Sequence, residues 1–147
     1  MSNWKKQLSA EGFRITVSRR AVMDVLLATS VPLSPREILE QGRRVHRKLG
    51  LVTVYRTLAL LEHLRCVRRV HREDGCHAYL PCSPGHSHAL ICRQCGRAAE
   101  FQGFEDLQAL IVRVEEATGY QVDDHLLQLS GLCLDCQSWG FIRRGPA

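Results

Sequence analysis

The spacing of apolar and polar positions predicts that the chain opens with four short helices. Residues 4–11 form an amphipathic segment that ends at Gly12. Thr16 or Ser18 can cap a second helix that runs to about residue 28, with apolar side chains along one face. Each of these two helices is therefore expected to bury one side.

The third and fourth helices carry clearer signals. The third starts at Ser34-Pro35-Arg36-Glu37, where the serine and glutamate side chains can satisfy free backbone donors reciprocally, and it fades near residues 42–46. The fourth is expected to open at Thr53 and to end near Leu64. Its expected buried stripe is Val54, Leu58, Leu61 and either Leu60 or Leu64. Three side chains are expected to lie largely off that stripe: Tyr55, Arg56 and Thr57.

A β-hairpin is predicted after the fourth helix. Residues 67–71 and 78–80 have the character of strands, and a turn is expected at Glu73-Asp74-Gly75. Short helices followed by such a hairpin predict a winged helix-turn-helix, which lays its last helix in the major groove of DNA. We expect this domain to occupy residues 1–81.

The rest of the chain is predicted to mix strands with one long helix. Strands are expected at residues 89–91, 98–101 and 126–132, and residues 104–118 have apolar side chains at helical spacing. Gly119 is expected to end that helix. The fold class is therefore α+β, with a winged helix-turn-helix domain followed by a small α/β domain.

Domain boundaries follow from composition. Pro81, Pro84 and Gly85 interrupt regular structure, and residues 82–85 are the expected hinge. Residues 86–140 are the expected second domain. Residues 141–147 are the expected tail, and residues 143–147 are predicted to be disordered.

Charge divides the chain at the same place. Residues 1–83 hold 15 Lys and Arg against 7 Asp and Glu, a net charge of +8, whereas residues 84–147 hold 5 against 8, a net charge of −3. A basic first half predicts a polyanionic partner, and double-stranded DNA is the expected one.

Basic and aromatic side chains of the first half are candidate DNA contacts. Arg56 is placed to reach a guanine edge or a phosphate, and Tyr55 a phosphate or a thymine methyl. Candidate phosphate anchors are Arg14, Arg19, Arg20, Lys5 and Lys6. The alternative for an exposed Tyr-Arg pair is a solvated helix face, and the basic winged helix favours contact with DNA.

Two Cys-x-x-Cys pairs are the strongest chemical signal. Cys92 and Cys95 form one pair, Cys133 and Cys136 form the other, and 37 residues separate them. Four thiolates at about 2.3 Å from one ion form the closed tetrahedral site of structural zinc. A redox pair or two disulfides are the alternatives, and two pairs flanking mixed structure favour zinc.

A second group of metal-binding side chains surrounds the hinge. His86 and His88 stand close together after Cys82, Glu100 follows the first cysteine pair, and His125 precedes the last strand. A mixture of imidazole, thiolate and carboxylate suits zinc, whereas imidazole and carboxylate sets also accept iron, manganese or nickel. A metal held here would fix the orientation of the two halves and so act as a switch.

Composition predicts a cytoplasmic protein without a membrane partner. No apolar run approaches the roughly 18 residues of a membrane span, and the first residues lack the apolar stretch of a secretory signal. Seven cysteines without an export signal indicate a reducing compartment, in which thiols serve as metal ligands.

Four segments resemble the ferric uptake regulator family of metal-sensing bacterial repressors. They are residues 14–20, 53–58, 86–96 and 131–136, and the resemblance extends over about residues 5–137. It implies an N-terminal winged helix on DNA, with Thr53 and Thr57 among the contacting residues, and a C-terminal dimerisation domain. It also implies a homodimer that binds palindromic operators when it is loaded with metal.

Within that family the chain is most similar to the zinc uptake regulators, because a cysteine precedes the hinge and Ser87 and Ala89 stand where iron sensors place histidines. The resemblance implies a sensory zinc site made from His71, Cys82, His86 or His88, and Glu100. A second regulatory site would use the remaining histidine with His125 and an acid, for which Glu105 is the candidate.

The function implied by the resemblance is a zinc-dependent repressor of metal uptake genes. The alternatives in the same family are iron, manganese or peroxide sensors, and Cys82 argues against the last. A zinc hydrolase that uses Cys82, His86 and His88, with Glu100 as the base, is the competing class. No H-E-x-x-H pattern accompanies those residues, so no catalytic residue is expected.

Overall fold

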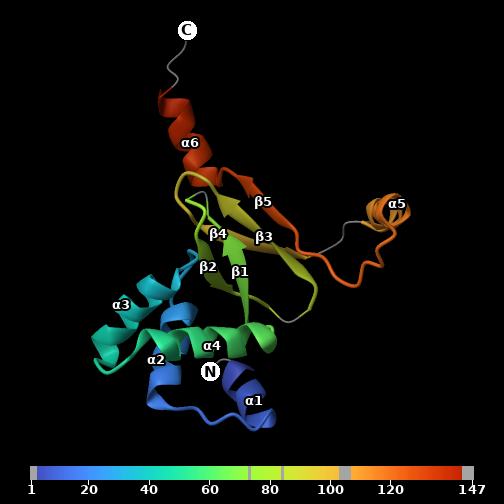
Figure 1. Cartoon of the computed structure of the whole chain (residues 1–147). Helices are drawn as coiled ribbons and strands as arrows, with labels where there is room; N and C mark the ends of the chain where they lie inside the picture. The colour runs from blue at the N-terminus through green and yellow to red at the C-terminus, as the bar shows by residue number, and fades with distance from the viewer. Residues whose placement is uncertain (1–2, 73, 84, 103–106, 144–147) are drawn as a thin grey trace.

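The computed structural model describes residues 3–72, 74–83, 85–102 and 107–143. Helices come first in the chain, and two small sheets follow them (Figure 1). The helical half consists of α1 (Asn3–Ala10), α2 (Val17–Leu27), α3 (Pro35–Val45) and α4 (Leu51–His63). Their apolar faces enclose one core, whose fully buried side chains include Leu8, Leu26, Ile38 and Leu58.

Side-chain caps fix the starts of α2 and α3, as the sequence predicts. The Thr16 hydroxyl accepts a hydrogen bond from the backbone amide of Arg19 at 3.2 Å. Ser34 and Glu37 form the predicted capping box: the serine hydroxyl accepts from the Glu37 amide at 3.3 Å, and the Glu37 carboxylate accepts from the Ser34 amide at 2.7 Å. Arg72 also donates to Glu37, at 2.9 Å, and thereby ties the hairpin to α3.

Helix α4 differs from the prediction at its start and in its buried stripe. It begins at Leu51 after Gly50, without a side-chain cap, so Thr53 lies inside the helix. The expectation that Thr57 lies off the buried stripe is wrong, because this side chain is only 2% exposed and its hydroxyl donates to the Thr53 carbonyl at 2.8 Å. Burial also removes Thr57 from the residues that can contact DNA.

The hairpin of β1 (Val67–His71) and β2 (His77–Pro81) lies between the helices and the second sheet (Figure 1). Its two faces serve different cores because side chains alternate along a strand. Val67 and Tyr79 belong to the core of the helices. Val70 and Ala78, paired across the hairpin, pack instead against the second sheet.

The second sheet has β3 (Ser87–Cys92) at its centre. The antiparallel β4 (Ala98–Gln102) lies on one side, and the parallel β5 (Gln128–Gly131) lies on the other. Ala89 and Ile91 of β3 contact the hairpin. The central strand of the C-terminal half is thus packed directly on the hairpin that follows α4.

Helix α5 (Gln108–Thr118) stands apart from the other elements (Figure 1). Gly119 ends it in the left-handed conformation, with φ of 73°, as the sequence predicts. The expected apolar stripe is present but not buried, since Leu110 is 49% exposed and Val114 41%. The predicted start of the helix at residue 104 lies outside the described residues.

A helix extends further toward the C-terminus than the sequence predicts. Helix α6 (Leu134–Arg143) includes the last zinc-ligand candidate and continues into residues 141–143, which were expected to belong to a tail. Residues 144–147 lie outside the described part. Among the described helices, none is long and apolar enough to cross a membrane.

Replacing Ser34 with alanine tests the start of α3. Removing the capping hydroxyl is expected to lower the free energy of unfolding by about 1 kcal/mol, the usual cost of losing such a cap. Urea denaturation followed by circular dichroism measures the change. Ser9→Ala, at an exposed position inside α1, is the matched control and should leave the unfolding free energy nearly unchanged. An equal loss in both variants would contradict a capping role for Ser34.

Candidate metal centres and DNA-facing helix

The four cysteines of the two Cys-x-x-Cys pairs converge, as the sequence predicts. The sulfur atoms of Cys92, Cys95, Cys133 and Cys136 all lie within 4.8 Å of one another. The distance between the sulfurs of Cys95 and Cys133 is 3.7 Å. A tetrahedron with metal–sulfur bonds of about 2.3 Å has edges of roughly 3.8 Å, so the distance between Cys95 and Cys133 matches a zinc site, and the other sulfur–sulfur distances in this four-cysteine cluster exceed that edge by no more than about 1 Å.

Local backbone contacts hold the two cysteine turns together. Cys92 ends β3, and the turn after it closes through the Gly96 amide, which donates to the Cys92 carbonyl at 2.8 Å. Gly96 has φ of 73°, a conformation that glycine adopts without strain. The Arg93 amide donates to the Gly131 carbonyl, and Arg97 forms an ion pair with Asp135 at 2.7 Å. These contacts join the sequence around one pair to the sequence around the other.

Two thiols of the cluster have very different pKa values. The amide of Cys133 donates to the Cys92 sulfur at 3.4 Å, and such bonds lower the pKa of Cys92 to about 6. Burial and hydrogen bonds with the other thiols raise the pKa of Cys136 to about 12. Four thiolates cannot share this volume without a compensating cation. A divalent ion supplies that charge, and its binding releases the remaining protons.

Three histidines form the second cluster of metal-binding atoms in the described residues. His86, His88 and His125 have ring nitrogens within 4.8 Å of one another. The ring centroids of His86 lie 4.6 Å from His88 and 4.7 Å from His125. His88 is 1% exposed and His86 is exposed, so the three-histidine cluster reaches from the interior to the surface. Imidazoles in this arrangement suit zinc, iron, nickel or copper.

The predicted sensory residues Cys82, Glu100 and His71 do not join that cluster. The thiol of Cys82 donates to the Arg65 carbonyl at 3.0 Å, and Glu100 accepts from the Ser83 amide and the Ser87 hydroxyl. The backbone of His71 makes two hydrogen bonds with the side chain of Gln128, at 3.0 and 2.8 Å. The structure therefore groups both His86 and His88 with His125, whereas the resemblance implies that only one of these two histidines joins His125 in a second site. Glu105 lies outside the described residues.

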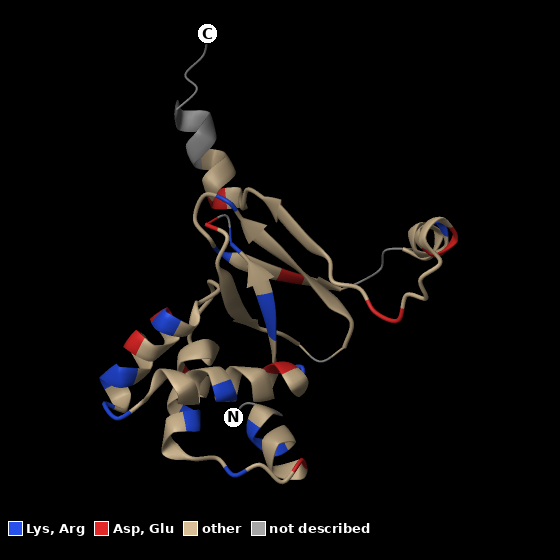
Figure 2. Cartoon of the chain, viewed as in Figure 1, with Lys and Arg blue, Asp and Glu red and all other residues tan. Residues whose placement is uncertain are grey.

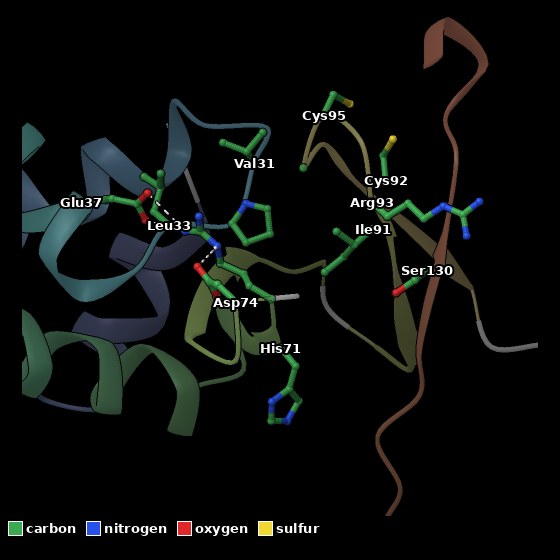
Figure 3. A pocket seen from close by; sticks show the side chains of 13 residues that line it. Val31, Leu33, Glu37, His71, Asp74, Ile91, Cys92, Arg93, Cys95 and Ser130 are labelled. Carbon is green, nitrogen blue, oxygen red and sulfur yellow. Dashed lines mark hydrogen bonds and ion pairs between the residues drawn. The ribbon is translucent and has the colours of Figure 1, made fainter. Parts of the chain in front are cut away.

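Cavities border both groups of metal-binding side chains. One, of about 270 Å³, is lined by Cys82, His86, His88 and His125 together with His71 and residues of β1. Another, of about 380 Å³, separates the first cysteine turn from α3 and the hairpin. In Figure 3, Glu37 and Asp74 lie on its helical side, and Cys92, Cys95 and Arg93 lie across from them.

Lysine and arginine residues are spread over the helical half, whereas most of the charged residues in α5 and in the segment after it are acidic (Figure 2). Tyr55 is 51% exposed and Arg56 is exposed on α4, as the sequence predicts. Arg14 is exposed before α2, and Arg19 is partly buried, with its guanidinium donating to the Arg14 carbonyl. Thr53 is partly buried, and its carbonyl is used by Thr57.

Sequence reasoning missed one residue at the junction of the halves. Arg68 of β1 donates to Ser87 at 2.7 Å and lies 3.7 Å from Glu100. The signal was present, because Arg68 shares a strand face with Val70, which packs on the second sheet. The alternation of side chains along β1 predicts which face Arg68 occupies, but it does not predict that the long side chain reaches Ser87 and Glu100.

Replacing Cys136 with serine tests the four-cysteine cluster. The variant is expected to lose the zinc that the unmodified protein retains on dialysis against a mild chelator, and its thermal unfolding midpoint should fall by more than about 5 °C. Elemental analysis and calorimetry measure both effects. Cys76→Ser, at an exposed cysteine outside the cluster, is the control and should keep the metal. A Cys136→Ser protein with a full equivalent of zinc would contradict the assignment.

Comparison with known proteins gives consistent matches along most of the chain. The zinc uptake regulation protein of Mycobacterium tuberculosis is 34% identical over 131 residues, which cover 89% of this chain and 100% of that protein. The ferric uptake regulation protein of Neisseria meningitidis serogroup A is 31% identical over 139 residues, which cover 91% of this chain and 93% of that protein.

Solved structures share the fold. A zinc uptake regulator complexed with zinc and DNA matches with a TM-score of 0.76 at 23% identity, covering 92% of this chain and 91% of that one. A zinc-bound manganese uptake regulator matches with a TM-score of 0.60 at 27% identity, covering 90% and 100%. The sequence model of the ferric uptake regulator family matches residues 10–130. This chain is therefore a member of the ferric uptake regulator family.

Proposed function

We propose that this protein is a metal-responsive transcriptional repressor in which metal bound by the three-histidine cluster controls the affinity for operator DNA. The observation that carries this proposal is the convergence of His86, His88 and His125 beside the hairpin that follows α4. The four-cysteine cluster is closed, so its metal is structural. The three-histidine cluster is partly exposed and offers fewer protein ligands, which suits a metal that exchanges.

The position of the cluster gives metal binding a route to the helices. His88 lies on β3, which packs on the hairpin through Ala89, and β1 follows α4 with three residues between them. A metal that draws the three imidazoles together favours one arrangement of β3 against the hairpin. It can shift the equilibrium between arrangements only by its difference in affinity for them.

Zinc is the metal that we propose, at the four-cysteine cluster and at the three-histidine cluster. Four thiolates are typical of zinc, and imidazole ligands accept it readily. Two relatives support this choice by their names, the zinc uptake regulation protein of Mycobacterium tuberculosis and the zinc uptake regulator solved with zinc and DNA. The proposed targets are genes of metal uptake.

Helix α4 is the proposed DNA-reading helix. Tyr55 and Arg56 lie on its exposed side, while Val54, Thr57 and Leu58 face the core. Arg14 and Arg19 lie at the start of α2 and are proposed to bind phosphates. A double-stranded operator is the proposed partner, in the cytoplasm, and no catalytic activity is proposed.

A homodimer is the proposed assembly, and α5 is proposed to form part of its interface. None of the described side chains of α5 is buried, although Leu110, Val112 and Val114 are apolar. On β3 and β5 of the second sheet, Leu90 and Leu129 are 39% and 45% exposed. A second copy would cover this apolar surface and would place two α4 helices on one palindromic duplex, separated by about one turn of B-DNA.

Replacing His125 with alanine tests the regulatory site. Metal is expected to raise operator affinity of the unmodified protein by roughly 5- to 150-fold, the range of common allosteric couplings, and the variant should lose this gain. Fluorescence anisotropy against buffered free zinc measures it, on a duplex selected by the unmodified protein from a random library. His63→Ala, at an exposed histidine at the end of α4, is the control. An undiminished zinc response in His125→Ala would refute this site.

Replacing Arg56 with alanine tests the DNA-reading helix. If its guanidinium reads a base, the variant should bind the selected operator more weakly by about 1 to 3 kcal/mol, with less effect on a shuffled duplex. If it binds a phosphate, both duplexes should weaken together and the salt dependence should become shallower. Titrations at several salt concentrations separate these results. Unchanged affinity for both duplexes would exclude Arg56 from the interface.

A further inference from the structure

The junction between the helical half and the second sheet contains an arginine at the position where the sequence predicts a sensory metal. The side chain of Arg68 is only 13% exposed. One guanidinium nitrogen donates to the Ser87 hydroxyl at 2.7 Å and lies 3.7 Å from a carboxylate oxygen of Glu100. Ser87 in turn donates to Glu100 at 2.5 Å. These side chains join β1 to β3 and β4.

The carboxylate of Glu100 is already committed to protein donors. The backbone amide of Ser83 donates to both of its oxygens, at 3.0 and 3.1 Å, and the Ser87 hydroxyl donates to one of them. Although burial raises the pKa of Glu100, these hydrogen bonds and the charge of Arg68 outweigh that effect and hold the pKa below its ordinary value. A metal could use this carboxylate only by displacing those donors.

Cys82 is equally unsuited to bind a metal in this arrangement. Its thiol donates to the Arg65 carbonyl at 3.0 Å, and burial raises the pKa of Cys82 despite the opposing effect of Arg68. A divalent ion placed between Cys82 and Glu100 would also lie against the positive guanidinium. Both the ligands and the charge of the junction therefore oppose a second cation.

We infer that Arg68 replaces a metal ion at this junction: with Ser83, Ser87 and Glu100 it forms a metal-free clamp between the two halves, and Cys82 and Glu100 are not metal ligands. The inference rests on the proposed function where it concerns regulation. It leaves the three-histidine cluster as the regulatory site of the described chain. Ser87 lies between His86 and His88, so metal bound by those histidines acts on a residue that Arg68 holds.

The first test is the number of zinc ions bound by the full chain. Two clusters predict that each subunit binds two zinc equivalents in the titration, and Cys82→Ser and Glu100→Gln should each still bind both. Zinc titration with a competing chelator, followed by elemental analysis, measures the stoichiometry. Loss of one equivalent in either variant, with normal circular dichroism, would overturn the inference. This result does not depend on whether the protein represses transcription.

The second test is the clamp itself. Arg68→Met removes the charge and keeps an apolar side chain, and Arg69→Met is the matched control on the same strand, where the arginine is 52% exposed. Hydrogen exchange of the Ser83 amide in metal-free protein should accelerate at least about tenfold in Arg68→Met and stay unchanged in Arg69→Met. Equal exchange in both variants would overturn the clamp.

A third measurement separates this inference from the proposed function. Arg68→Met should bind zinc at the three-histidine cluster but show a smaller zinc-dependent gain in operator affinity than the unmodified protein, by roughly fivefold or more. A gain as large as that of the unmodified protein would contradict a coupling role for Arg68. If the unmodified protein itself shows no gain, the proposed function fails, and the stoichiometry and hydrogen exchange still decide whether the clamp exists.

Discussion

The alternation of side chains along β1 is the constraint on which the rest of the structure depends. Val67 packs with the helices, whereas Val70 packs on the second sheet, and Arg68 crosses to β3 and β4 on the same face as Val70. A strand with a period of two can serve two cores at once, and a shift of register by one residue would exchange them. The two halves of the chain therefore share a structural element. They are not joined by the hinge alone.

Buried charge is compensated differently at the four-cysteine cluster and at the junction between the helical half and the second sheet. At the four-cysteine cluster the donors are all potential anions, and burial raises the pKa of Cys136, so the site needs a cation to become fully ionised. At the junction, the anionic Glu100 already faces Arg68 and hydrogen-bond donors. The same physical requirement, that buried charge be compensated, thus favours a metal in one place and makes it unnecessary in the other.

The sequence predicts correctly those features of the fold that depend on neighbouring residues or on a known metal-binding motif. Neighbouring residues determine the capping box at Ser34 and the end of α5 at Gly119. The convergence of the four cysteines could be predicted because two Cys-x-x-Cys motifs are typical of one zinc site. The burial of Thr57, which the sequence analysis did not predict, agrees with its position three residues after Val54 and one before Leu58, a spacing typical of a buried stripe. The grouping of His125 with both His86 and His88, and the reach of Arg68, depend on tertiary geometry that no local pattern expresses.

In the proposed dimer, the packing of helix α5 depends on a second copy of the chain. None of its apolar side chains is buried by the described residues of its own chain, so in the proposed dimer their burial is completed on association. By mass action, the fraction of molecules with a well-packed α5 rises with the amount of protein present. Cellular abundance would then act as an input beside the metal, and dilution alone would weaken the ordered state even at constant free zinc.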